Sequence, residues 1–314
     1  MGEGAAHNRV CEAILNAVER ALDAGREFRV MIVVPDQLEE SFVLEPLSYF
    51  TRRTLLQDSP LGSRGEFAEE ACLRTRIQRL LAEKRPGVEA DPDSILSICG
   101  LAQAQKSPAG KWCTQSVFVH SKVLLVDDKY MVCGSANVND RSLMGDRDSE
   151  LGVLLTDDHE PDMIDSTMAG KPFRSGRTLL NFRLRTFRAF LGLDEGGADD
   201  GAIIDPVTAF GRLWSATAAK NRALLSAVFK YTPRDSITSF SQWSKIKEAS
   251  FGEGDDDTGS PYVEGSDPDQ LTEFRGLLVP TAVFRRPGKA VGTRADAGVD
   301  SSVSTGVLIE RFCL

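Results

Sequence analysis

The sequence predicts an α/β fold in which amphipathic helices alternate with short apolar strands. Three features support this fold class. Residues 8–24 carry an apolar stripe at helical spacing, and residues 28–34 and 117–126 are apolar runs rich in β-branched side chains. The chain has 314 residues, of which 41% are hydrophobic, so it can bury a sizeable core as one large domain or two close-packed ones.

The elements follow in a regular order. The first helix begins at Asn8, which can cap its N-terminus, and Gly25 ends it. The segment after the 28–34 strand contains a helical pattern over 67–84. Further strands are predicted near 95–101 and at 151–155, and helices at 179–193 and 207–230. The Gly-, Asp- and Ser-rich segment 252–270 is expected to be a flexible loop.

The run 117–126 reads as one buried strand that contains His120 and Lys122. Side chains alternate along a strand, so these two residues should point to the same face. Apolar neighbours on both faces predict a central strand covered on both sides. A polar turn follows at 127–130, and 131–133 should return as the second strand of a hairpin. This hairpin would bring the segment 134–137 back beside His120.

The residue types on this hairpin suit phosphate chemistry. Lys122 supplies a point charge, and Ser135 and Asn137 supply donors, for the non-bridging oxygens of a phosphate. Gly134 has no Cβ, so its backbone can approach a ligand closely. His120 titrates near neutral pH and can pass a proton.

Two carboxylates complete the candidate site. A carboxylate on the second ring nitrogen of His120 would fix its tautomer and favour its charged form, and Glu150 is the candidate for this position. Asp127 follows a strand and begins a turn, which indicates that it caps backbone groups and does not contact substrate.

The joint spacing H-x-K-x4-D-x6-G-S-x-N, followed by Arg147-Asp-Ser-Glu150, resembles the second HKD motif of the phospholipase D superfamily. It is most similar to the C-terminal half of the eukaryotic phosphatidylcholine-hydrolysing enzymes, and the likeness covers residues 8–280 in patches. The resemblance implies a phospholipase D-like fold with an α-β-α layered mixed sheet, one HKD half, and helical C-terminal additions. It divides the chain into an HKD catalytic half (1–200, with an inserted helical stretch at 60–92), an extension (201–280) and a divergent tail (281–314).

In that family, two such motifs share one site. The first-motif histidine attacks phosphorus, and the second-motif histidine protonates the leaving alcohol and then activates water or an acceptor alcohol. The resemblance therefore implies conversion of phosphatidylcholine to phosphatidic acid and choline, or transphosphatidylation, with His120 as general acid/base. It gives a catalytic set of His120, Lys122, Asp127 and Glu150, and a phosphate-binding set of Lys122, Gly134, Ser135 and Asn137. No metal or organic cofactor is expected.

The chain lacks a second H-x-K, because its other histidines, His7 and His159, have no lysine two positions later. Three hypotheses remain open. The chain can be the C-terminal half of a phospholipase D whose first motif comes from missing N-terminal sequence or a separate chain. It can be a one-motif phosphodiesterase in which a homodimer brings two His120 residues together. It can also be a catalytically incomplete half that binds lipid or phosphate.

Composition and charge limit the substrates, partners and cellular location that we expect for this chain. A net charge of −9 argues against a nucleic-acid substrate and leaves phospholipid at a membrane surface. Six cysteines without a C-x-x-C pair indicate thiols in a reducing compartment. The sequence contains no apolar run near 18 residues, so we expect a cytoplasmic protein with peripheral membrane association. The basic segment 171–190 suits anionic headgroups, or alternatively forms a solvated face paired with the acidic run 194–205.

Overall fold

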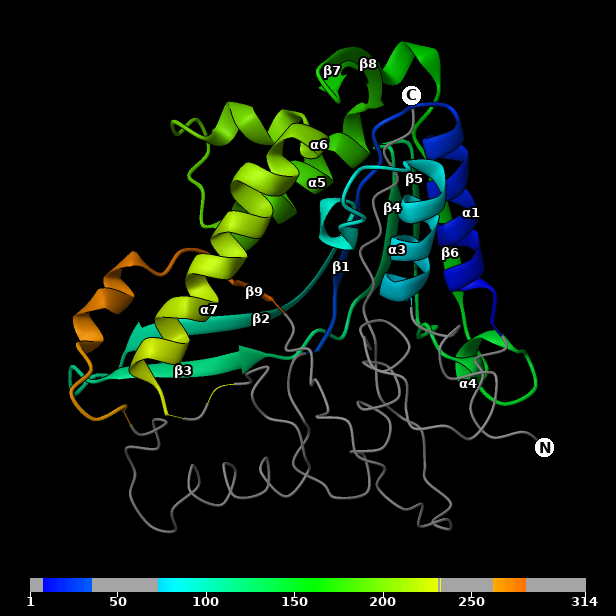
Figure 1. Ribbon diagram of the computed structural model, residues 1–314. Helices are drawn as coiled ribbons and strands as arrows, with labels where there is room; N and C mark the ends of the chain where they lie inside the picture. The colour runs from blue at the N-terminus through cyan, green and yellow to red at the C-terminus, as the bar shows by residue number, and fades with distance from the viewer. Residues whose placement is uncertain (1–7, 36–72, 231, 233–261, 281–314) are drawn as a thin grey trace.

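The computed structural model describes residues 8–35, 73–230, 232 and 262–280. It contains both helices and strands along the described chain, as expected for the predicted α/β class (Figure 1). The N-terminal part contains α1 (Val10–Asp23), β1 (Val30–Val33), α3 (Leu73–Lys84), β2 (Leu96–Lys106) and β3 (Trp112–Val117). The hairpin region contains β4 (Lys122–Val126), β5 (Tyr130–Gly134), α4 (Asp140–Leu143) and β6 (Gly152–Thr156). The C-terminal part contains β7 (Met163–Met168), β8 (Lys171–Gly176), α5 (Arg177–Leu191), α6 (Pro206–Ala209), α7 (Ala216–Val228) and β9 (Leu278–Pro280).

The first helix forms where its apolar stripe predicts it. The Asn8 side chain accepts a hydrogen bond from the Val10 amide (3.3 Å), and the chain leaves the helix through Gly25 at φ +62°. One face of α1, with Val18 and Ala21 fully buried, packs against α3. Helix α3 is the part of the predicted 60–92 insertion that the structure shows as helical, and residues 60–72 lie outside the described residues.

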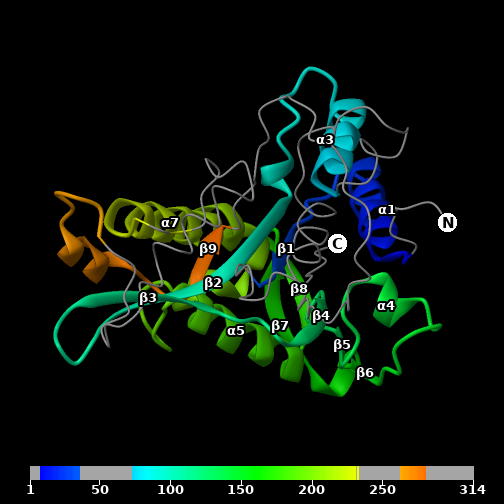
Figure 2. The same cartoon turned by 90° about the horizontal axis from the view of Figure 1, so that it is seen from below.

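Strand β1 lies between two helical layers. Val30 and Ile32 face the cluster formed with α1 and α3, whereas Met31 and Val33 face a second cluster that includes Phe187 of α5. All four strand residues are buried, as expected for a strand covered on both faces. Figures 1 and 2 show α1 and α3 on one side of β1 and α5 on the other. This arrangement confirms the α-β-α layering.

The first sheet is mixed. Strand β1 pairs in parallel with β2, with Val30 opposite Leu96. Strand β2 then pairs antiparallel with β3, and β9 joins β2 antiparallel from the far end of the sequence. Strand β9 thus belongs to the same sheet as β1 and β2, and α7 packs against β9, while the domain boundary expected at residue 200 stays a prediction.

The second sheet carries the motif and has the order β4-β5-β6, all antiparallel. The prediction of one strand over 117–126 is wrong, because β3 ends at Val117 and β4 begins only at Lys122. Strand β4 is also not central, since it forms one end of this sheet in the described part of the chain. It is nevertheless covered on both faces, with Leu124 against the α1–α3 cluster and Leu125 against Leu179 of α5.

The C-terminal helices form close to their predicted positions. Helix α5 ends at Gly192 (φ +63°), where a Cβ would lie 2.3 Å from the Gly276 amide nitrogen, so a side chain at this position would collide with backbone. The predicted 207–230 helix consists of α6, a π-helical stretch Phe210–Ser215, and α7. Within 252–270, residues 262–270 include a bridge from Tyr262 to Phe229 and part of a 3₁₀ turn. Residues 252–261 and 281–314 lie outside the described residues.

Candidate functional site

The β4–β5 hairpin aligns the two parts of the motif. Lys122, the first residue of β4, pairs with Gly134, the last residue of β5. The Lys122 ammonium donates a hydrogen bond to the His120 carbonyl oxygen (2.6 Å). Partial burial lowers the pKa of Lys122, and the nearby Glu150 carboxylate opposes this effect. The hairpin expected from the sequence is therefore confirmed, and it places Lys122, Gly134 and Ser135 at one end of the sheet.

His120 lies outside the strands, in the connection between β3 and β4. The expectation that it shares a strand with Lys122 is wrong, because residues 118–121 leave the ladder before β4 begins. Its side chain is exposed, with the imidazole ring 6.0 Å from the Phe118 ring between centroids. An exposed imidazole can exchange protons with a bound molecule or with water.

Ser135 joins β5 to β6 through side chain and backbone. Its hydroxyl donates to the Glu150 carboxylate (2.5 Å) and accepts from the Leu151 amide (3.0 Å). The Ser135 amide donates to the Leu151 carbonyl oxygen (3.0 Å). The Ser135 hydrogen bond is the main cause that lowers the pKa of Glu150. Ser135 is thus already fixed in position, with Glu150 ionised beside it.

Glu150 contacts Ser135, and no hydrogen bond joins it to the His120 imidazole among the described residues. The orienting role expected for Glu150 therefore stays a prediction. The Glu150 carboxylate is instead close enough to Lys122 to raise the pKa of the lysine, against the effect of burial. This arrangement links the lysine and the serine of the motif through one acidic side chain.

Gly134 is required for a reason that differs from the one expected. A Cβ at this position would lie 2.4 Å from the Leu151 carbonyl oxygen and 2.8 Å from the Gly152 Cα. Real Cβ atoms do not approach backbone so closely, so Gly134 allows β6 to approach β5. The predicted contact between Gly134 and phosphate is not tested by this structure.

The loop between β5 and α4 holds Asn137 next to this sheet end. The Asn137 carbonyl oxygen accepts from the Asn139 amide (2.8 Å), and the Asn139 side chain caps the Ser142 amide (2.9 Å). An ion pair from Arg141 of α4 to Asp148 (2.6 Å) fastens the segment between α4 and β6 to this helix. Asn137 is half-buried, and its role toward phosphate stays a prediction.

Asp127 and Asp128 form the hairpin turn, both with positive φ values (54° and 52°). Asp and Asn tolerate this conformation better than other side-chain-bearing residues, which explains the acidic pair at this position. The turn closes with a hydrogen bond from the Lys129 amide to the Val126 carbonyl oxygen (3.0 Å). The location of Asp127 in a turn agrees with the expectation from the sequence, while its inclusion in the catalytic set stays a prediction.

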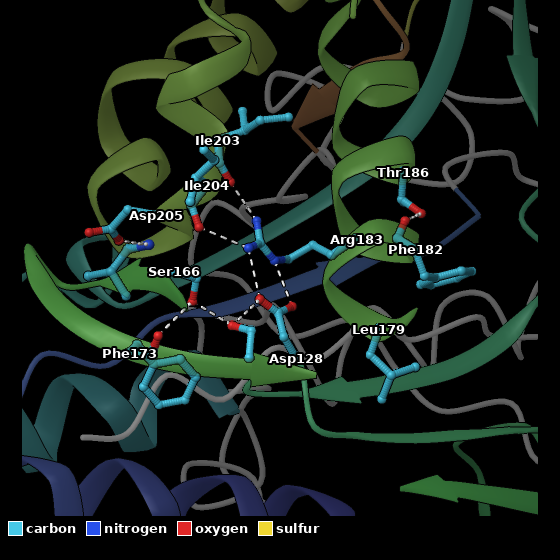
Figure 3. A network of polar contacts seen from close by, with 12 residues as sticks. Asp128, Ser166, Phe173, Leu179, Phe182, Arg183, Thr186, Ile203, Ile204 and Asp205 are labelled. Atoms are coloured by element: carbon cyan, nitrogen blue, oxygen red, sulfur yellow. Dashed lines mark hydrogen bonds and ion pairs between the residues drawn. The ribbon is translucent and has the colours of Figure 1, made fainter. Parts of the chain in front are cut away.

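Sequence reasoning missed the buried ion pair behind this turn. Arg183 of α5 donates to both carboxylate oxygens of Asp128, at 2.8 and 2.9 Å, and both side chains are almost fully buried. Arg183 also donates to the carbonyl oxygens of Ile203 (2.6 Å) and Ile204 (3.0 Å), as Figure 3 shows. The only sequence signal was two consecutive acids in a turn, which cannot indicate which of them faces the interior.

Among the residues that the structure describes, three of the six basic side chains in the segment 171–190 form ion pairs with acidic partners. Arg188 pairs with Asp200 (2.6 Å), and Arg174 pairs with Asp165 (2.8 Å). Pairing with the acidic run 194–205 is thus confirmed for Arg188. The expectation of a solvated face is wrong for Arg183, which is buried against Asp128.

Within the described ranges, no helix combines the length and apolarity needed to cross a bilayer. The same ranges contain no group of three or more His, Cys, Asp or Glu side chains arranged to hold a metal ion.

An α/β fold in which a β-hairpin places the lysine of H-x-K beside a Gly-Ser pair, with the histidine in the connection just before the hairpin, has the architecture of an HKD-motif protein. The Phospholipase D family profile matches residues 83–208, which include this hairpin. Phospholipase D zeta 1 of Arabidopsis thaliana is 33% identical over 303 residues, covering 88% of this chain and 26% of the relative. Phospholipase D1 of Homo sapiens is 29% identical, covering 87% and 23%, and Phospholipase D B of Dictyostelium discoideum is 35% identical, covering 71% and 17%. The chain belongs to the phospholipase D superfamily, and it spans about a quarter or less of these relatives.

Proposed function

We propose that this chain supplies one of two HKD motifs to a site that cleaves phospholipid phosphodiesters, converting phosphatidylcholine to phosphatidic acid and choline or transferring the phosphatidyl group to an alcohol. The observation that carries the proposal is the pairing of Lys122 with Gly134, which places the two parts of the motif side by side. The relatives named phospholipase D support the lipid substrate.

Each motif residue has a role in this proposal. The exposed His120 imidazole protonates the leaving alcohol and then removes a proton from water or an acceptor alcohol. Lys122, Ser135 and Asn137 bind the non-bridging phosphate oxygens, where positive charge and hydrogen-bond donors stabilise the developing negative charge. For this purpose the Lys122 ammonium exchanges its present bond to the His120 carbonyl oxygen for a phosphate oxygen.

The nucleophilic histidine comes from a second HKD half. His159 is exposed, lies 3.4 Å from Asp162, and is not followed by the lysine of an H-x-K pattern, whereas His7 lies outside the described residues. The second half is part of the same longer chain, a separate chain, or a second copy. Because the substrate is a membrane lipid, the complete enzyme works by peripheral association with a membrane surface.

The test is complementation of the purified chain. It is mixed with a separately produced polypeptide that carries the first HKD motif of a phospholipase D relative, and choline release is measured on phosphatidylcholine vesicles. The mixture is expected to release choline, and His120→Asn should lower the rate by about 10²- to 10⁴-fold. His159→Asn is the matched control and should retain the rate.

Three outcomes separate the alternatives. Undiminished release by the His120→Asn mixture would contradict the role of His120. If the chain alone released choline at a rate that increased with the square of its concentration, the result would support the homodimer hypothesis over an enzyme with two different halves. If the chain bound vesicles but no mixture released choline, the result would support the hypothesis of a catalytically incomplete half that binds lipid.

A further inference from the structure

Strand β6 is an apolar strand with little cover. Val153, Leu154 and Leu155 are 53%, 64% and 41% exposed, and Leu151 just before the strand is 76% exposed. Alternate residues of a strand face opposite sides of a sheet, so large apolar side chains are uncovered on both faces of β6. Scattered single apolar residues are normal on a protein surface, but four exposed large apolar residues within five positions, interrupted only by Gly152, indicate a contact surface.

The free edge of β6 also offers backbone hydrogen bonds. In the antiparallel pairing with β5, bonds are seen from the Ser135 amide to Leu151 and from the Asp157 amide to Lys129. Hydrogen-bonded residues alternate along such a ladder, so Gly152, Leu154 and Thr156 direct their N–H and C=O groups away from β5. In the described part of the chain, β6 pairs with no strand other than β5.

The charges at the two ends of β6 define the partner. Glu150 precedes the strand, and its hydrogen bond from Ser135 favours the ionised form. The exposed Asp158 follows the strand and accepts a hydrogen bond from the neutral Tyr130 hydroxyl. An added strand therefore meets acid at both ends and apolar surface between them. We propose that β6 binds an extended segment of a partner protein that has an apolar centre flanked by Lys or Arg, which joins the sheet as a fourth strand.

Two other occupants fit less well. A second copy that paired all of β6 with its own β6 would be centred on Leu154 and would set Glu150 opposite Asp158 at both ends, and directly opposed like charges are destabilising. A lipid surface would leave the outward N–H and C=O groups of Gly152, Leu154 and Thr156 without partners in an apolar medium, which costs several kcal/mol per group.

This surface adjoins the candidate site and shares Glu150 with it. The Leu151 backbone is bonded to Ser135, so a strand bound along β6 begins one residue from the phosphate-binding hydroxyl. A partner bound here would stand beside the site and lengthen the sheet that carries it. The proposal concerns binding alone and does not depend on the chemistry proposed for His120.

The test uses the whole chain and synthetic peptides of about ten residues, a length that spans one strand with its flanks. The first peptide has a Val- and Thr-rich centre flanked by lysines, the second has the same centre flanked by glutamates, and the third carries proline in the centre. Binding is measured by fluorescence anisotropy. The lysine-flanked peptide is expected to bind at least about tenfold more tightly than the others.

Amide hydrogen exchange then locates the peptide. Bound lysine-flanked peptide should slow exchange at Gly152, Leu154 and Thr156, while exchange at the β4 amides stays unchanged. Leu154→Lys should abolish binding, because a charge on an edge strand prevents strand addition. Val88→Lys, at an apolar residue that is 63% exposed elsewhere, is the matched control and should bind normally.

If Leu154→Lys fails to fold, Thr156→Pro removes one outward N–H and replaces it in the test. Equal binding of lysine- and glutamate-flanked peptides would overturn the charge argument, and protection elsewhere in the chain would overturn the site. A β6-dependent dimer in sedimentation, or β6-dependent binding to phosphatidylcholine vesicles, would assign the surface to a second copy or to lipid. Each of these results leaves the His120 complementation assay unaffected.

Discussion

Arg183 on α5 and Asp128 in the hairpin turn form a buried ion pair that ties the motif-bearing sheet to the C-terminal helices. Both side chains are almost fully buried, and every contact that Arg183 makes in Figure 3 is to an oxygen atom: two of a carboxylate and two of backbone carbonyls. The guanidinium is thus well matched by acceptors, which is the condition under which a buried pair can be tolerated.

Breaking this pair should destabilise the fold. Arg183→Met leaves the Asp128 carboxylate buried without its cation, and we expect a loss of about 3–5 kcal/mol in the free energy of unfolding by urea. The double variant Arg183→Met/Asp128→Asn should recover part of the loss, because no charge then remains buried and Asn tolerates the positive φ of this turn position. Arg174→Met, at an ion pair with an exposed acid, is the control and should cost less than about 1 kcal/mol. If Arg183→Met also cost less than about 1 kcal/mol, the buried pair would not contribute to stability as we expect.

Gly134 and its partner Gly152 should respond differently to a methyl group. Gly134→Ala forces a Cβ against the Leu151 carbonyl and the Gly152 Cα, so we expect a loss of about 1–3 kcal/mol on urea unfolding. Nothing lies within 4 Å of a Cβ at Gly152, so Gly152→Ala should change stability by less than about 1 kcal/mol. Equal effects of the two substitutions would contradict the close approach of β5 and β6.

The hydrogen bond from Ser135 should set the acid response of Glu150. It lowers the folded-state pKa below the unfolded value, so the stabilisation by Glu150 is present above the unfolded pKa and is lost as pH falls through the folded pKa. Ser135→Ala should raise the Glu150 pKa in a carbon-detected NMR titration, and the stability that this carboxylate loses in acid should be smaller and fully lost at a higher pH. Ser149→Ala, at an exposed neighbouring serine, should leave the titration unchanged. An unchanged Glu150 pKa in Ser135→Ala would refute this assignment.

Substitution of the two hairpin lysines, Lys122 and Lys129, should affect the choline-release activity differently. Lys122→Met removes the cation proposed for the phosphate oxygens, and the complemented choline-release assay should fall by about 10²- to 10³-fold. Lys129→Met makes the same change in the turn, at the opposite end of the hairpin, where the ammonium lies 4.5 Å from the Phe173 ring centroid. This control should keep the activity. Comparable losses for both variants would indicate a general effect of charge.

Several features could be predicted from the sequence because they depend on neighbouring residues. The apolar spacing of α1, the apolar run of β1 and the acidic turn at 127–128 are local signals, and the structure confirms each of them. The hairpin follows from the same signals, since two strands joined by a short turn must pair. The roles expected for the candidate residues came from the resemblance to the HKD motif.

Other features required the tertiary structure. Residues 118–121 lie within the apolar run 117–126, yet the chain leaves the ladder there, so His120 does not share a strand with Lys122. Helix α5 selects Asp128, not Asp127, by placing Arg183 behind the turn. Glu150 meets Ser135 because β6 returns beside β5, an approach that Gly134 permits.

The sequence by itself therefore determined α1, β1, the β4–β5 hairpin and the identity of the motif residues, because periodicity and turn chemistry act over a few positions. Only the tertiary structure decided that Arg183 pairs with Asp128 and that Ser135 bonds to Glu150. It also decided that the apolar side chains of β6 remain exposed. Those outcomes depend on contacts between segments far apart in the chain, such as Asp128 with Arg183, and local pattern carries no information about them.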